Sequence, residues 1–104
     1  MMSVQIEYDK LLAGIDDAVS ASQMFGKACL KIHGKAFVAQ HKDTIVFKLV
    51  APEHTQALAL LNAVLWDPSG KGRPMKQWVA LPMSASDYFQ KFYLAALKNI
   101  ANGG

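Results

Sequence analysis

Apolar and polar residues alternate in three short runs in the middle of the chain, between residues 24 and 50. In the first run, Leu30 and Ile32 alternate with polar or small neighbours, a pattern typical of a strand that buries one face. The second run covers residues 36–40 and the third covers residues 44–50. Because short polar segments separate the runs, we predict three consecutive antiparallel strands, a β-meander.

The first reversal of the meander contains Gly34 and Lys35. Glycine at the first central position suits a two-residue hairpin loop, since it adopts a positive φ without a Cβ clash. With this loop, Ile32 lies opposite Phe37. The predicted apolar face then comprises Leu30, Ile32, Phe37 and Ala39.

The length of the second reversal follows from the apolar pattern of the third run. Ile45, Phe47 and Leu49 share one side of that strand. A two-residue loop would move them to the other face, because a one-residue slip exchanges the faces of a strand. A three-residue loop, His41-Lys42-Asp43, places Phe37 opposite Phe47. We therefore predict the three-residue loop, with both phenylalanine rings on the same buried face.

The segment before the meander has a helical pattern. Apolar positions in residues 5–21 recur at the i, i+3, i+4 and i+7 spacing, with charged residues on the opposite side. We predict a helix there, weakened by about 1 kcal/mol at Gly14. Ser20, Ser22 and Gln23 are interpreted as a polar connector into the meander. We also expect Phe25 to be anchored in the core and Gly26 to mark a bend.

A second helix is predicted directly after the meander. Pro52 and Glu53 are typical of a helix start, and an apolar stripe of Leu58, Leu61 and Leu65 follows at helical spacing. A loop rich in glycine and proline then covers residues 66–74.

The last part of the chain predicts one strand and one helix. The strand covers residues 75–82 and ends at a proline. Trp78 and Ala80 lie on one side of its alternation and Val79 and Leu81 on the other, and either set could face the core. Residues 84–87 resemble a capping box. The amphipathic stripe of the final helix comprises Phe89, Phe92, Tyr93, Ala96 and Ile100, and Asn102-Gly103 supplies its stop signal.

These elements predict an α+β fold with the order α-β-β-β-α-β-α. An antiparallel meander sheet of four to five strands would carry flanking N- and C-terminal helices, with one helix inserted after the third strand. The additional strand would be a short one around residues 64–66. The helices are expected to cover one face of the sheet.

Length and composition favour a single domain over residues 1–104, able to bury roughly two thirds of the surface of its unfolded chain. The 11 Lys and Arg residues against 8 Asp and Glu give a net charge of +3, which permits contact with nucleic acid without requiring it. There is one cysteine, no apolar run of the ~18 residues that a membrane helix needs, and no secretory signal pattern. We therefore expect a cytoplasmic protein without membrane contact.

Three residue patterns invite comparison with known catalytic or ligand sites. Residues 69–72, Ser-Gly-Lys-Gly, lack the full spacing of a phosphate-binding P-loop, and Pro74 follows at once. Cys29 and His33 lie four residues apart on one strand, or ~13 Å, too far to share one zinc ion. No base and orienting acid are placed beside Cys29 to activate its thiol. We therefore expect no catalytic residue, no metal site and no cofactor.

The cations form a more suggestive pattern. Lys31 and Lys48 fall on the strand face opposite to the apolar set, and the other cations sit on turns or strand ends. Such side chains can contact the phosphates of a nucleic acid, although a solvated sheet face with lysines at its edges has the same pattern. The candidate residues for contact with nucleic acid or another partner are Lys31, Lys35, Lys48, Lys71, Arg73 and Lys76.

Two further interpretations compete with this one. Val38 and Val46 are predicted on the same face as the lysines, where they would favour a homodimer or partner contact. Arg73 could instead have a structural role, stacked on Trp66 or Trp78.

Four segments carry a family likeness. They are Met24-Phe25-Gly26, Gly34-Lys35-Ala36-Phe37, the strand of residues 44–49, and Gly72-Arg73-Pro74-Met75-Lys76-Gln77-Trp78-Val79. With these segments the chain resembles the TfoX N-terminal-domain family and the related MmcQ/YjbR family, over nearly its whole length. The resemblance implies an α+β fold with an antiparallel sheet flanked by helices. It also implies a link to transcriptional regulation of DNA uptake, and it supplies no catalytic residues.

We therefore expect a non-enzymatic regulatory or binding domain whose partner is nucleic acid or a transcription-related protein. The alternative is a protein-interaction module that forms a homodimer through its open sheet face.

Overall fold

The computed structural model describes residues 6, 8, 10, 19–24, 26–68, 70–72 and 74–101. Within these ranges six strands form one antiparallel sheet in the spatial order β1-β2-β3-β4-β6-β5. The strands are β1 Val19–Met24, β2 Lys27–Ile32, β3 Lys35–His41, β4 Thr44–Lys48, β5 Val64–Trp66 and β6 Met75–Pro82. The expected α+β class is confirmed, and the short strand expected around residues 64–66 is β5.

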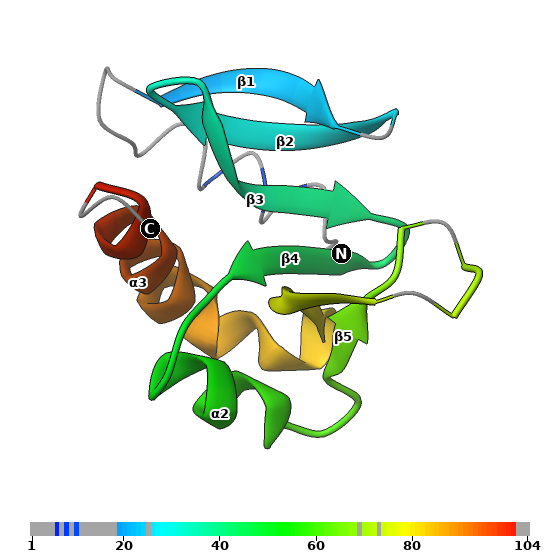
Figure 1. The fold of residues 1–104 in the computed structure, drawn as a ribbon. Coiled ribbons are helices and arrows are strands. Elements are labelled where there is room, and N and C mark those ends of the chain that lie inside the picture. Colours follow the sequence, from blue (N-terminus) through cyan, green and yellow to red (C-terminus); the bar gives the residue numbers. More distant parts are fainter. Residues whose placement is uncertain are drawn as a thin grey trace.

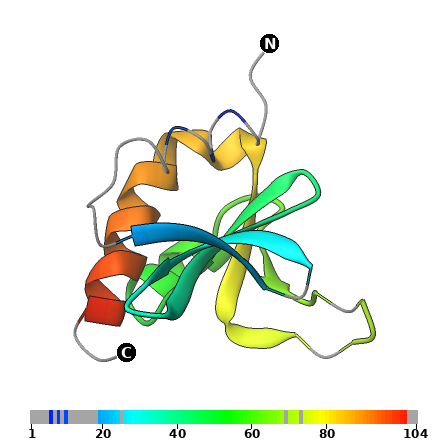
Figure 2. The same ribbon diagram turned by 90° about the horizontal axis from the view of Figure 1, so that it is seen from above.

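The helices pack against the sheet. They are α2 Glu53–Leu58, the 3-10 helix η1 Met83–Tyr88 and α3 Phe89–Ala101. Helix α3 packs on β2, β3 and β4, and α2 packs beside β6 (Figure 1). Seen from above, α3 lies on one side of the strands and the loop between β5 and β6 lies on the other (Figure 2). The two faces of the sheet therefore have different surroundings.

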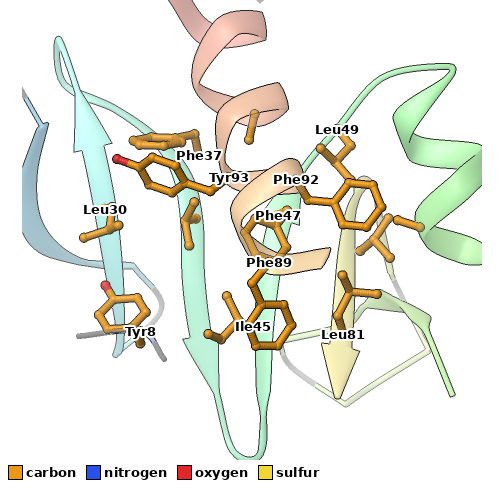
Figure 3. Packing of buried hydrophobic residues seen from close by; sticks show 14 of the residues in the cluster. Tyr8, Leu30, Phe37, Ile45, Phe47, Leu49, Leu81, Phe89, Phe92 and Tyr93 are labelled. Atoms are coloured by element: carbon orange, nitrogen blue, oxygen red, sulfur yellow. The ribbon is translucent and has the colours of Figure 1, made fainter. Parts of the chain in front are cut away.

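On the helix-covered face lies the main core. Its aromatic centre is Phe37, Phe47, Phe89 and Phe92, all at most 2% exposed, with Phe47 in ring contact with both phenylalanines of α3 (Figure 3). The stripe predicted for the last helix, Phe89, Phe92, Tyr93, Ala96 and Ile100, is buried in this core as expected. The helix forms because its apolar positions recur every three to four residues and all meet the sheet.

The opposite face carries a second buried group, which we call the tryptophan cluster: Cys29, Ala39, Val46, Trp66, Trp78 and Ala80. The ring centroids of Trp66 and Trp78 lie 5.4 Å apart, and small side chains from the central strands lie beneath them. Both alternating sets of β6 are thus buried, Val79 and Leu81 in the main core and Trp78 and Ala80 in the tryptophan cluster.

The tryptophan cluster closes because β5 and β6 are irregularly paired. Leu65 lies opposite Val79, but the next residue, Trp66, lies opposite Met75, so residues 76–78 of β6 have no partner on β5. Extra residues on one strand bend it and increase its twist. The bend brings both indole rings over the central strands.

The predicted first hairpin loop is wrong by one residue. Ile32 pairs with Lys35, so the loop is His33-Gly34, and both residues have positive φ, 51° and 78°. Two positive φ values in a two-residue loop match the twist of the flanking strands, and histidine is one of the residues that tolerates this conformation.

A β-bulge then corrects the register within the same hairpin. Leu30 pairs with Val38 but Lys31 pairs with Ala36, which leaves Phe37 as the extra residue of β3. Because of the bulge, Phe37 and Val38 both belong to the main core, and Ala39 belongs to the tryptophan cluster. The prediction that Ala39 shares a face with Phe37 is therefore wrong.

The second hairpin loop has two residues, Lys42-Asp43, because His41 pairs with Thr44. The predicted three-residue loop is wrong, yet Phe37 and Phe47 are both fully buried in the main core, as expected. The bulge explains this outcome, since it moves Val38 onto the core face, opposite Phe47. Val38 and Val46 are also fully buried, so neither supplies the exposed surface predicted for them.

The N-terminal boundary also differs from the prediction. Ile6, Tyr8 and Lys10 are helical, but strand β1 begins at Val19, inside the segment predicted as a helix, and includes the expected connector. β1 is an edge strand whose side chains are mostly exposed. Its sequence therefore lacks the apolar alternation that predicts a half-buried strand. Gly26 lies in the turn after it with φ of 74°, as the expected bend requires. Gly14 and Phe25 lie outside the described residues.

The helix after the meander is shorter than predicted. α2 ends at Leu58, Leu61 is 80% exposed, and Leu65 lies in β5. The leucine spacing therefore continues past the end of the helix, because the chain turns into a strand that needs apolar residues of its own.

The burial of Phe47 predicts the cost of removing its ring. Phe47→Ala should lower the free energy of unfolding by about 3–5 kcal/mol, because the cavity would lie between the sheet and α3. Chemical denaturation monitored by circular dichroism measures the loss. Leu94→Ala, at a 52% exposed position of the same helix, is the control and should change stability by at most about 0.5 kcal/mol. A similar small change for Phe47→Ala would contradict the assignment of this ring to the core.

Candidate nucleic-acid interface

Three lysines share the sheet face that carries the tryptophan cluster. Lys27 and Lys31 alternate with Cys29 along β2, and Lys48 follows Val46 by two positions on β4. Alternate residues of a strand point to the same side of the sheet, so all three side chains emerge beside the cluster. All three are half-buried. We call Lys27, Lys31 and Lys48 the lysine face.

The dimensions of the lysine face follow from the strands. Lys27 and Lys31 are separated by four residues, or ~13 Å along β2, and β4 lies two strands away, or roughly 10 Å. Among the described carboxylates none forms an ion pair with these three lysines. As far as the described residues go, the face therefore carries positive charge that could attract an anionic partner.

More cations lie at the end of the sheet that holds the β1–β2 turn, the Lys42-Asp43 turn and the loop between β5 and β6 (Figure 1). Lys42 is exposed in its turn, and Lys71 is exposed in the loop. The loop is closed by Asp67, whose Oδ1 accepts a hydrogen bond from the Gly70 N–H at 3.0 Å and whose Oδ2 accepts one from the Gly72 N–H at 2.8 Å. Asp67 thus stabilises the backbone conformation of this loop.

The predicted contact residues do not form one group. Lys31 and Lys48 lie together on the lysine face, and Lys71 lies at the end of the sheet just described. Lys35 follows the first hairpin loop, at the opposite end, because successive hairpin turns of a meander alternate between ends. Lys76 is exposed on β6, where its carbonyl oxygen accepts a hydrogen bond from His54 Nε2. Arg73 lies outside the described residues.

Sequence reasoning missed one pair of side chains at the loop end of the sheet. The Trp66 Nε1–H donates a hydrogen bond of 2.6 Å to His41 Nδ1, and the two rings meet edge to face at 6.0 Å between centroids. The partners are 25 residues apart, so no local spacing could have indicated the contact. Thr44 Oγ1 also donates to the backbone carbonyl of His41 at 2.7 Å, which fixes the residue from its other side.

This geometry sets the protonation state of His41. An indole N–H is only a donor, so His41 Nδ1 must be the unprotonated acceptor and the neutral ring carries its proton on Nε2. Partial burial lowers the pKa of His41, and the positive charges of Lys27 and Lys42 lower it further. Folding therefore favours the neutral imidazole.

A pocket of about 250 Å³ opens beside this histidine. Its walls are mainly apolar, and it is lined by His41, Lys42, Thr44, Val64, Leu65, Trp66, Asp67 and Ala80. The irregular pairing of β5 with β6 forms one wall of it, and the second hairpin forms the other.

Cys29 does not have the surroundings of a nucleophile. Its side chain is fully buried in the tryptophan cluster. Burial raises the pKa of the thiol, and the nearby charge of Lys31 lowers it by a smaller amount. At neutral pH the thiol stays protonated and inaccessible, which is the inert form of the residue.

The His41–Trp66 contact predicts a dependence of stability on pH. Because the pKa of His41 is lower in the folded state, the contact contributes fully above the ordinary histidine value of about 6.5, and its contribution is lost as the pH falls below that value. Urea denaturation at about pH 7.5 and about pH 5.5 should show the difference. In His41→Asn the amide oxygen can accept from the indole without titrating, so this variant should lose that part of the pH dependence. An unchanged pH dependence in the variant would contradict the assignment.

The burial of Cys29 predicts slow alkylation. Native protein treated with iodoacetamide at neutral pH should remain unmodified while denatured protein is labelled, as measured by intact mass. Rapid labelling of the native chain would show that the tryptophan cluster is open.

Among the described residues, no group of three or more His, Cys, Asp or Glu side chains gathers in an arrangement that could hold a metal ion. No described helix combines the length and apolar character needed to cross a membrane. No match to this chain was found among models of protein families, curated proteins or solved structures. The resemblance to the TfoX N-terminal-domain family therefore stays a prediction, and the function is argued from the residues of this chain.

Proposed function

We propose that this chain is a non-enzymatic binding domain and that its lysine face contacts the phosphates of a nucleic acid. The observation that carries the proposal is the convergence of Lys27, Lys31 and Lys48 on one sheet face without an ion pair to any described carboxylate. Cations that no described carboxylate neutralises are available for phosphate oxygens.

The charge distribution supports the same partner. Of the described carboxylates, Glu53 and Asp87 lie on α2 and η1, Asp67 accepts hydrogen bonds from backbone N–H groups, and Asp43 is exposed beside Lys42 in the second hairpin loop. Burial is the larger cause of the shifted pKa values of Cys29 and His41, and the described charges that add to it are those of Lys31 at Cys29 and of Lys27 and Lys42 at His41. A phosphate approaching this side of the sheet meets an attractive field.

The spacing of the lysines also suits a nucleic-acid backbone. A distance of ~13 Å along β2 corresponds to about four base steps of a duplex at ~3.4 Å each. Three phosphate contacts would give a slope of about −2.7 for log K against log salt on duplex DNA, or about −2 on a single strand. Binding should thus be weak at physiological salt and much stronger at low salt.

The transcriptional role and the homodimer have fewer observations behind them. A role in transcriptional regulation, or a transcription-related protein as the partner, rests on the family resemblance alone. A homodimer through the open sheet face was expected to use Val38 and Val46, and both are buried, whereas Val64 at the edge of that face is 56% exposed. We therefore place nucleic acid first.

The salt dependence of binding tests the proposal. In the double variant Lys31→Ala, Lys48→Ala the slope of log K against log salt should become less steep by about 0.7–0.9 for each lysine removed, with a loss of affinity for all nucleic-acid sequences alike. Fluorescence anisotropy with a labelled oligonucleotide, at several salt concentrations, measures both quantities.

The matched control is Lys91→Ala, Lys98→Ala, which removes the same charge from exposed positions of α3. It should leave the slope nearly unchanged. Equal effects of the two double variants would show that only net charge matters, and an absence of binding by the parent protein at low salt would overturn the proposal.

A further inference from the structure

The pocket beside His41 adds a second kind of contact next to the lysines. It lies at the loop end of the sheet, where Lys42 forms part of its lining and Lys27 is close enough to lower the pKa of His41. Apolar walls come from Val64, Leu65 and Ala80. An apolar hollow bordered by cations is the arrangement that a ring with an attached anion requires.

We propose that this pocket receives one unpaired base of a single-stranded nucleic acid, with the flanking phosphates on Lys42 and Lys27. The inference rests on the proposed function and narrows it from nucleic acids in general to single strands. Bases inside a duplex cannot enter a pocket of this kind, because their faces are stacked and their edges are paired.

The size of the pocket favours a base over a larger ligand. Sites for drug-sized molecules usually enclose about 300–1,000 Å³, and this pocket has about 250 Å³. It therefore accommodates a single planar ring system. Its open mouth allows the sugar and phosphates to remain outside.

The side chains at the mouth supply the contacts that a base makes with protein. His41 offers an imidazole ring for stacking, and its Nε2–H is the donor that remains after Nδ1 has accepted the bond from Trp66. The ring is held in place by Trp66 and by the Thr44 bond to its backbone. Because the ring is fixed before binding, little conformational entropy is lost when a base stacks on it.

The charge around the pocket suits the phosphates of a strand. Lys42 and Lys27 both act on His41. The one carboxylate in the pocket lining, Asp67, accepts backbone hydrogen bonds on both oxygens, so its charge is partly compensated there. Among the described residues around the mouth, Lys27 and Lys42 stand near the imidazole, while the exposed Asp43 follows Lys42 in its turn.

The first experiment distinguishes contacts to the base from contacts to the phosphates of the strand. Binding of a labelled oligothymidylate is compared at low salt with binding of an abasic strand of the same length, which has the same phosphates, and with a duplex. The parent protein should bind the oligothymidylate about tenfold more tightly than the abasic strand, as expected for one stacked base. The duplex reports the phosphate contacts alone, with the steeper salt dependence expected of its higher charge density.

The second experiment locates the base. Val64→Glu places a carboxylate in the pocket wall at a position that is 56% exposed, and Leu61→Glu places the same charge at an 80% exposed position outside the pocket lining. Both exposed sites should tolerate the change, which thermal unfolding verifies. Val64→Glu should reduce the ratio of the two affinities to about one, and Leu61→Glu should keep it near tenfold.

The outcomes distinguish this inference from the proposed function. If oligothymidylate and abasic strand bind equally, with the salt dependence of the lysine face intact, the base pocket is wrong and the phosphate surface stands. A preference that survives in Val64→Glu would also overturn the pocket. If the parent protein binds none of the three probes, both proposals fail together.

Discussion

One extra residue in β3 sets the register of this sheet. The bulge at Phe37 lets two consecutive residues, Phe37 and Val38, face the helices, where regular alternation would allow only one. Downstream of it, Ala39 points to the opposite face and Phe47 lies against Val38 on the core side. The packing of α3 on the sheet depends on this change, since Phe37 contacts Tyr93 and Phe47 contacts Phe89.

A second irregularity, between β5 and β6, makes the other face of the sheet. Residues 76–78 have no partner on β5, although Trp78 still pairs with Lys48 of β4, and Trp66 and Trp78 lie over small residues of the central strands. Small side chains are needed there, because an indole ring occupies the space that larger residues would fill. The face that a meander would leave to solvent is thereby closed by the protein itself.

The candidate interface is a consequence of these two irregularities. With the tryptophan cluster in place, Lys27, Lys31 and Lys48 emerge at its border, half-buried and without an ion pair to any described carboxylate. The irregular pairing of β5 with β6 positions Trp66 to bond His41, so a neutral imidazole is fixed at the mouth of a pocket. Phosphate contacts and a base contact thus arise on adjoining parts of one surface.

The sequence by itself determined the local elements whose pattern is strong. Three meander strands, the strand of residues 75–82 and the amphipathic stripe of α3 follow from periodicity, because each has one face that must be buried. The position of Lys31 and Lys48 opposite the core follows from the same alternation. The sequence did not predict edge strand β1, because few of its side chains are buried. The leucines beyond α2 suggested a longer helix, because leucine occupies buried positions in helices and strands alike.

The tertiary structure alone decided the registers and the site. A loop shorter by one residue and a bulge compensate each other, so the apolar pattern that places Phe37 and Phe47 on one face is satisfied by more than one register. The burial of Val38 and Val46, the closure by two tryptophans and the bond between His41 and Trp66 all join residues distant in sequence. Local periodicity carries no information about such contacts, because it records which face of an element is buried and not what buries it.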